Sequence, residues 1–256
     1  MRILQIVVPG AGEFDRKLKR VDAAALPEIY VDAGADLAHV YGPVSETPPM
    51  RYVAANVPPK RRFALRAPRA PERLIAPLPA DGHVVVPEAV EEHYFADRRP
   101  PIDRERKVAG YFARPSVENL VEQTAARVAR NRDDIDFLAF SATPQPEDFE
   151  ACDVWLDPAI DDSDYDGFVA EAMARGVSVV AARTAINVHR SERGRTAWLV
   201  PPRDSNELTH AILAALFKPE MSEARRSAAR QTISKFRPRQ RAKALAALYE
   251  SLTPRP

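Results

Sequence analysis

The chain has few cysteines, few glycines and almost no net charge, and each shortage excludes a class of protein. A single cysteine, Cys152, among 256 residues excludes an internal disulfide and a cysteine-based zinc cluster, and predicts a small buried residue in a reducing compartment. Nine glycines limit the places where a loop can wrap around a phosphate. Lys and Arg number 37 against 36 for Asp and Glu, so we expect no nucleic-acid partner.

Long apolar runs and several common catalytic motifs are also missing. No stretch approaches the roughly 18 apolar residues of a transmembrane helix, and the apolar run at residues 2–8 is too short for a secretory signal. The chain lacks Gly-x4-Gly-Lys-Ser/Thr, His-Glu-x2-His and Gly-x-Ser-x-Gly, the minimum parts of common nucleoside triphosphatases, zinc hydrolases and serine hydrolases. These absences predict a cytoplasmic protein of another class, with 45% hydrophobic residues to build a core.

Strands alternate with helices along most of the chain. Apolar runs at 2–8 and 37–41 are each followed by proline and glycine, and a regular alternation begins at residue 107. This order specifies parallel sheets covered by helices, the α/β class. In the regular part we expect strands at 107–112, 135–140, 154–156, 177–181 and 197–200, and helices at about 117–128, 147–151, 166–175, 205–217 with Asp204 as N-cap, 219–236 and 239–252.

Residues 45–80 are rich in proline and in basic side chains, and two interpretations stay open. One is a solvated loop region with short strands near Tyr52, Phe63 and Leu74. The other is a basic face at residues 51–73 for an anionic acceptor, a phospholipid or a partner protein. The second interpretation would bring the chain to the inner face of a membrane as a peripheral protein.

Four segments carry a recognisable pattern. Residues 153–181 contain Glu-Ala-Met-Ala-Arg-Gly from Glu171, residues 194–204 are similar to G-x-T-G-L-L-V-P-P-G-D, and residues 36–43 are similar to D-x-x-H-x-H-G-P. With the closing helix after Phe236, they resemble the GT-B-fold glycosyltransferases of family 4, the group 1 transferases. The resemblance implies two Rossmann-like domains: a reduced acceptor-side domain at 1–85, a donor-binding domain at 86–236, and a C-terminal helix at 237–256 that crosses back.

The resemblance also implies a donor site built from carboxylates, a cation and backbone amides. Glu171 matches the second acid of the family's E-x7-E and would hold sugar hydroxyls, while Ser163 stands in place of the first acid. Arg114 and the amides near the start of the following helix would support the diphosphate. The implied catalytic residues are Glu171 and His39, the latter on the acceptor side, and the implied donor-binding residues are Gly10, Gly12, Arg114, Ser163, Asp166, Gly167, Phe168 and Asn187.

Two departures from the family pattern affect the donor site. Where the family has G-G-N-P-E, residues 185–189 keep only Asn187, so the diphosphate loop should be reshaped or narrowed. The family's pair of basic residues maps onto Tyr111 and Arg114, which leaves one cation. Asp162, Asp164 or Asp166 could replace the first acid. Plainer interpretations also stay open: Glu171 as an exposed helix carboxylate, and residues 161–166 as a solvated capping loop instead of a ribose binder. His39 is then structural, and His189 and His210 are surface residues.

The resemblance implies an enzyme that moves a sugar from a nucleotide-diphospho-sugar to a glycan, lipid or small-molecule acceptor. It further implies retention at the anomeric carbon, no metal and no cofactor beyond the donor. The short N-terminal part leaves open a homodimer that completes the cleft. An alternative is a non-catalytic homologue that serves as a binding or scaffold subunit, because an acid and two glycines of the pattern are absent. A nucleotide-sugar epimerase is a third reading, which the sequence around Glu171 argues against.

Overall fold

The computed structural model of the chain describes residues 3–7, 19–24, 37–41, 52–55, 73–76, 83–85, 88–96, 104–161, 164 and 168–252. In the strands before residue 86, only the backbone is described, apart from Gln5. The chain forms two compact units, Met1–Glu91 with Phe236–Pro256, and Glu92–Lys235. The sequence-based divisions after residues 85 and 236 lie near these junctions. The reduced size of the N-terminal domain stays a prediction.

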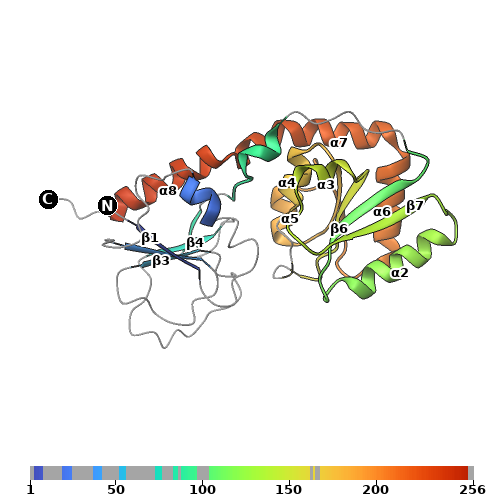
Figure 1. The fold of residues 1–256 in the computed structure, drawn as a ribbon, viewed down its shortest axis with the longest axis horizontal. Coiled ribbons are helices and arrows are strands. Elements are labelled where there is room, and N and C mark those ends of the chain that lie inside the picture. Colours follow the sequence, from blue (N-terminus) through green and yellow to red (C-terminus); the bar gives the residue numbers. More distant parts are fainter. Residues whose placement is uncertain are drawn as a thin grey trace. The chain divides into compact units, whose positions relative to one another are not determined.

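The first unit contains a five-stranded parallel sheet whose strands follow the order of the chain (Figure 1). Parallel pairing begins with Ile3 opposite Leu37 and continues strand by strand across the sheet. The strands are β1 (Ile3–Val7), β2 (Leu37–Tyr41), β3 (Tyr52–Ala55), β4 (Arg73–Ala76) and β5 (His83–Val85). Strands at Tyr52 and Leu74 are therefore confirmed inside the proline-rich region, whereas Phe63 lies outside the described residues.

A C-terminal helix, α8 (Pro238–Leu252), belongs to this first unit although it is the last element of the chain. Residues 19–24 are helical, and Figure 1 shows them beside α8. Arg241 of α8 donates two hydrogen bonds to Asp22, from Nε to Oδ1 at 2.6 Å and from Nη2 to Oδ2 at 2.9 Å. Their side chains are only 2% and 1% exposed, so a buried ion pair joins segments 219 residues apart.

The second unit holds a five-stranded parallel sheet with the order β10-β9-β8-β6-β7. The first strand in the chain, β6, lies inside the sheet: β7 is added on one side of it and β8 to β10 on the other. The strand order therefore reverses between β6 and β8, as in a doubly wound sheet. The strands are β6 (Lys107–Phe112), β7 (Ile135–Phe140), β8 (Val154–Asp157), β9 (Ser178–Ala182) and β10 (Trp198–Val200).

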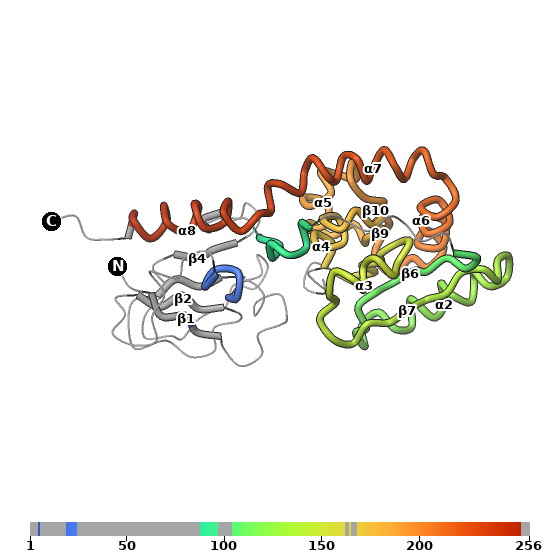
Figure 2. The backbone as a smooth tube through the Cα atoms, turned by 45° about the horizontal axis from the view of Figure 1, so that its top comes forward, coloured from blue at the N-terminus to red at the C-terminus, as the bar shows by residue number. Residues whose placement is uncertain are grey.

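The helices of the second unit are η1 (Glu92–Phe95), α2 (Glu118–Ala129), α3 (Pro146–Glu150), α4 (Val169–Ala174), α5 (Ala185–Arg190), α6 (Ser205–Phe217), α7 (Pro219–Thr232) and η2 (Ile233–Phe236), whose last residue already belongs to the first unit. Helices α2 to α5 connect the strands, η1 precedes them, and α6, α7 and η2 follow them (Figure 2). The α/β class with parallel sheets, predicted from the alternation, is confirmed. The sequence reading missed α5 and η1.

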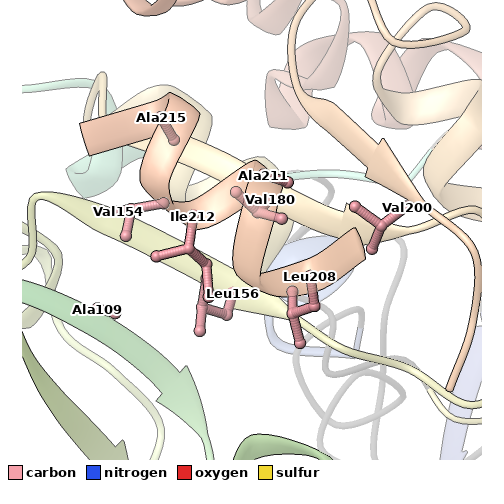
Figure 3. Packing of buried hydrophobic residues seen from close by; sticks show 9 residues of the cluster. All are labelled: Ala109, Val154, Leu156, Val180, Val200, Leu208, Ala211, Ile212 and Ala215. Atoms are coloured by element: carbon pink, nitrogen blue, oxygen red, sulfur yellow. The ribbon is translucent and has the colours of Figure 1, made fainter. Parts of the chain in front are cut away.

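The packing of α6 shows how the apolar pattern builds this unit. Leu208, Ala211, Ile212 and Ala215 follow a helical period and are almost fully buried. In Figure 3 they face strand residues that include Val154, Leu156, Val180 and Val200. The predicted N-cap is confirmed, since Asp204 Oδ1 accepts hydrogen bonds from the amides of Asn206 and Glu207 at 3.0 Å.

In the part of the chain that is described, no helix has both the length and the apolar character needed to cross a membrane. Cys152 is buried, as the sequence predicts, and burial raises the pKa of its thiol to about 12. The thiol is therefore neutral near pH 7 and is not a nucleophile. It lies beneath Gly110 of β6, where a Cβ would come within 2.3 Å of its Sγ.

Candidate functional site

Polar side chains gather at the carboxyl edge of the second sheet, where the strand order reverses. Arg114 follows β6 by two residues, and Asp157 is the last residue of β8. Because β6 and β8 are neighbouring parallel strands, both side chains start from the same edge. In open α/β sheets, ligands bind in the crevice at this point of reversal. The position alone makes the edge between β6 and β8 the candidate site.

Arg114 is the cation of this site. Its Nη2 donates to Asp157 Oδ1 at 3.2 Å, and its Nε lies 3.4 Å from Asp164 Oδ1. The Arg114 side chain is 14% exposed, so the guanidinium is largely but not fully withdrawn from water. Two carboxylates thus face one guanidinium, and its orientation is fixed by both.

Asp157 is the fully buried anchor of the site, and the sequence reading missed it. Its other oxygen, Oδ2, accepts a hydrogen bond from Nδ2 of Asn187 at 2.8 Å. One carboxylate therefore links the segment after β6 with α5, with a charge-assisted bond on each oxygen. A signal was present in the sequence, since Asp157 ends the apolar strand that begins at Val154, and a carboxylate in that position is costly to bury without partners.

Asn187 lies on α5, which occupies the place of the glycine-rich loop. Thr184 caps this helix, and its Oγ1 accepts from the amide of Asn187 at 3.3 Å. The segment forms a short helix with Ile186 buried, and the reshaping of the diphosphate loop stays a prediction. Nδ2 of Asn187 also donates to the carbonyl of Ala182 at 3.1 Å. Oδ1 of Asn187 is buried, and among the described residues no group donates to it.

Asp164 is the second carboxylate on Arg114, and it makes three polar contacts. Its Oδ1 accepts from the hydroxyl of Ser116 at 2.7 Å, and its Oδ2 accepts from the amide of Ile160 at 3.0 Å. The ion pair with Arg114 is the third contact. The Asp164 side chain is 15% exposed, so this carboxylate is held by two hydrogen bonds and an ion pair yet remains in reach of water.

Glu171 and Phe168 lie at α4. Glu171 is fully buried, so the interpretation as an ordinary exposed helix carboxylate is wrong. Phe168 is 1% exposed and its ring centroid lies 5.0 Å from that of Phe112. This aromatic contact packs the start of α4 against the end of β6.

The remaining candidate residues are placed less fully. His39 lies in β2 of the first unit, paired in register with Gln5 and Val53. His189 and His210 are exposed, as predicted. The structure thus brings together Arg114, Asp157, Asp164 and Asn187. The candidates Gly10, Gly12, Ser163, Asp166 and Gly167 lie outside the described residues.

Metal-ligating residues do not cluster in the part of the chain that is described: no group of three or more His, Cys, Asp or Glu side chains there is arranged to hold an ion. Among the residues that the structure describes at this edge, Arg114 is the cation that contacts both Asp157 and Asp164. Any anion bound at this edge would meet that guanidinium.

Comparison with known proteins gives a family and a fold. Residues 81–217, more than half of the chain, match the family described as "Glycosyl transferases group 1". No curated protein matches the chain significantly.

Solved structures with the same fold include Anabaena Alr3699/HepE in complex with UDP and glucose, with a TM-score of 0.75 and 14% identity over 98% of this chain and 100% of that one. A glycosyltransferase from Rickettsia africae has a TM-score of 0.67 and 11% identity over 98% of each chain. Sucrose-phosphate synthase from Thermosynechococcus elongatus has a TM-score of 0.61 and 16% identity over 94% of this chain and 79% of that one. At such identities, the likeness shows the fold, the two-domain GT-B architecture.

Proposed function

Because this chain belongs to the group 1 glycosyltransferases, we propose that it transfers a sugar from a nucleoside-diphosphate donor, with retention at the anomeric carbon and without a metal ion. The observation that carries the proposal is the guanidinium of Arg114 at the point of strand reversal, which is oriented by its ion pair with buried Asp157. Departure of a diphosphate develops negative charge, and a preoriented cation stabilises that charge with little reorganisation. Arg114 is proposed to take the part that a metal plays in other transferases.

The other site residues have proposed roles around that cation. Glu171 accepts hydrogen bonds from the sugar hydroxyls, and Oδ1 of Asn187 accepts a hydrogen bond from a hydroxyl group of the nucleotide-sugar. The backbone near Gly167 and Phe168 supports the diphosphate, with Ser163 and Asp166 beside the donor. From the first unit, Gly10 and Gly12 close over the donor and His39 assists the acceptor.

Uridine diphosphate is the first donor nucleotide to test, because Anabaena HepE has been solved with UDP-glucose. The experiment is calorimetry and thermal shift with UDP, GDP, ADP and TDP and their common sugar conjugates, since a ligand that binds only the folded state raises its melting temperature. We expect one diphosphate to bind. Arg114→Ala should weaken it about 10- to 100-fold, the worth of a hydrogen bond to a charged group. Exposed Arg130 provides the matched control, and Arg130→Ala should bind like the wild type.

Turnover separates an enzyme from a binding protein. Glu171→Gln keeps the size of a buried side chain and should abolish transfer and donor hydrolysis while the donor still binds. Folding of each variant is checked by circular dichroism. If no diphosphate shifts the melting temperature of well-folded protein, the proposal fails.

A non-catalytic binding or scaffold subunit is the second candidate. It is favoured by Ser163 in place of an acid and by α5 in place of a glycine-rich loop. Donor binding without any transfer or donor hydrolysis, across a panel of glycan, lipid and small-molecule acceptors, would support it.

Peripheral membrane contact is proposed for the basic residues 51–73, most of which lie outside the described residues. Binding to liposomes should then rise with the fraction of anionic lipid and fall with salt. Liposome binding that does not change with anionic lipid content would refute the contact. A homodimer that completes the site is a separate proposal, which sedimentation at assay concentrations tests.

A further inference from the structure

The carboxylate of Asp164 is bound in the way that a phosphate is usually bound. It accepts hydrogen bonds from the hydroxyl of Ser116 and the backbone amide of Ile160, and it forms an ion pair with the guanidinium of Arg114. Arginine, serine and backbone amides are the groups that proteins commonly direct at anions. The donors come from two segments, one after β6 and one after β8, so they converge at the point of strand reversal.

The net charge of the described side chains at this point is negative. Among the described residues at this point, the positive charge of Arg114 faces the two carboxylates of Asp157 and Asp164. A further anion that approached Arg114 would be repelled by both carboxylates, and at low effective dielectric this repulsion is appreciable. The site as it stands therefore disfavours the ligand that its donors could bind.

We propose that Asp164 is an internal occupant of the anion site, which competes with the diphosphate of the donor for Arg114 and Ser116 and so sets the affinity for that donor. The inference rests on the proposed function, since it takes the diphosphate as the ligand. A bound diphosphate displaces Asp164 from Arg114 and from Ser116, while Asp157 stays in place.

Burial decides which of the two carboxylates is displaced. Asp157 has no exposed surface, and both of its oxygens are bonded, to Arg114 and to Asn187. Moving it would leave buried polar groups without these partners, which is costly. Asp164 is 15% exposed and its partner Ser116 is an exposed residue, so water can replace the contacts that Asp164 gives up.

The test is calorimetric titration of the folded chain with inorganic pyrophosphate and with UDP. Asp164→Asn keeps the shape of the side chain and an oxygen for the amide of Ile160, but removes the competing charge. We expect it to bind pyrophosphate about 10-fold more tightly than the wild type, because close like charges on a partly buried site interact strongly. Asp164→Ala should also bind more tightly, which separates the effect from any new contact made by asparagine.

Asp153→Asn is the matched control. Asp153 precedes β8 at the opposite, amino edge of the same sheet, where it accepts from the amide of Val108 at 2.8 Å. The variant removes the same unit of charge at the other edge of the sheet from Arg114. Its affinity for pyrophosphate should stay within about twofold of the wild type, because salt screens the interaction between charges separated by more than about 10 Å. An equal gain in both variants would show a general charge effect and overturn the inference.

The two ligands separate failure of this inference from failure of the proposed function. Tighter pyrophosphate binding by Asp164→Asn, with no nucleoside diphosphate bound by any variant, supports the proposal that Asp164 occupies the anion site. The same result refutes the proposal that the chain uses a nucleoside-diphosphate donor. UDP binding by the wild type with no gain in Asp164→Asn or Asp164→Ala refutes the internal occupant and leaves the transferase proposal in place. A loss of affinity in both Asp164 variants would show that Asp164 is a ligand-binding residue instead, and would also overturn the inference.

Discussion

Removing Asp22 should release α8 from the first unit. In Asp22→Ala, the guanidinium of Arg241 loses two hydrogen bonds, of 2.6 Å and 2.9 Å, at a position only 2% exposed. Breaking one side of such a buried pair costs about 3–5 kcal/mol. Since each 1.4 kcal/mol is a factor of about ten, the equilibrium for local opening of α8 should rise by more than about 100-fold.

Native-state hydrogen exchange measures that opening residue by residue. Amides of α8 should exchange faster in Asp22→Ala, whereas amides of α6 in the second unit should keep their wild-type rates and serve as the internal control. The double variant Asp22→Ala/Arg241→Leu removes both charges and should recover most of the protection. An unchanged exchange rate in α8, or a double variant that loses as much as the two single variants added together, would refute this account of the pair.

Two further predictions concern the second unit. Gly110→Ala should cost about 1–3 kcal/mol of stability through overpacking against Cys152, and Gly110→Ala/Cys152→Ala should regain part of it in denaturant titrations; equal losses in both would contradict the steric cause. Hydrogen bonds from Lys235 and Arg195 lower the pKa of Glu192 to about 2, below its ordinary value of 4.5. The stability that ionised Glu192 contributes is therefore complete above pH 4.5 and is lost as the pH falls toward 2. The melting-temperature gap between wild type and Glu192→Gln should therefore narrow from pH 6 to pH 3, and a constant gap would refute it.

Elements with a strong local pattern could be predicted from the sequence. The strands at 107–112 and 135–140 and the helix at 205–217 have their expected bounds. The apolar pattern of each lies within its own segment, and Asp204 marks the start of the helix. The helix α5 could not be predicted in the same way. Its six residues are too few for a clear period, and its stability depends on the Thr184 cap and on burial of Ile186.

The candidate site was predictable only in part. Arg114 follows from its position after a strand, but its partners lie 43 and 50 residues away, at Asp157 and Asp164, and contacts of this range leave no local pattern. Asp164 illustrates the difficulty. The sequence offers it as a substitute for a missing acid near the donor sugar, whereas the structure shows its carboxylate on Arg114, Ser116 and the amide of Ile160.

The pairing of both ends of the chain in one unit has a consequence for biosynthesis. Glu92–Lys235 is continuous, so the ribosome delivers every residue of that unit before α8 is made. The first unit instead needs Arg241 before Asp22 can gain its buried partner. Domains fold as units during synthesis, so the order of folding should reverse the order of translation, with the second unit complete first. Until α8 emerges, Asp22 lacks the guanidinium with which it is buried, which makes this interval the one in which a chaperone would act.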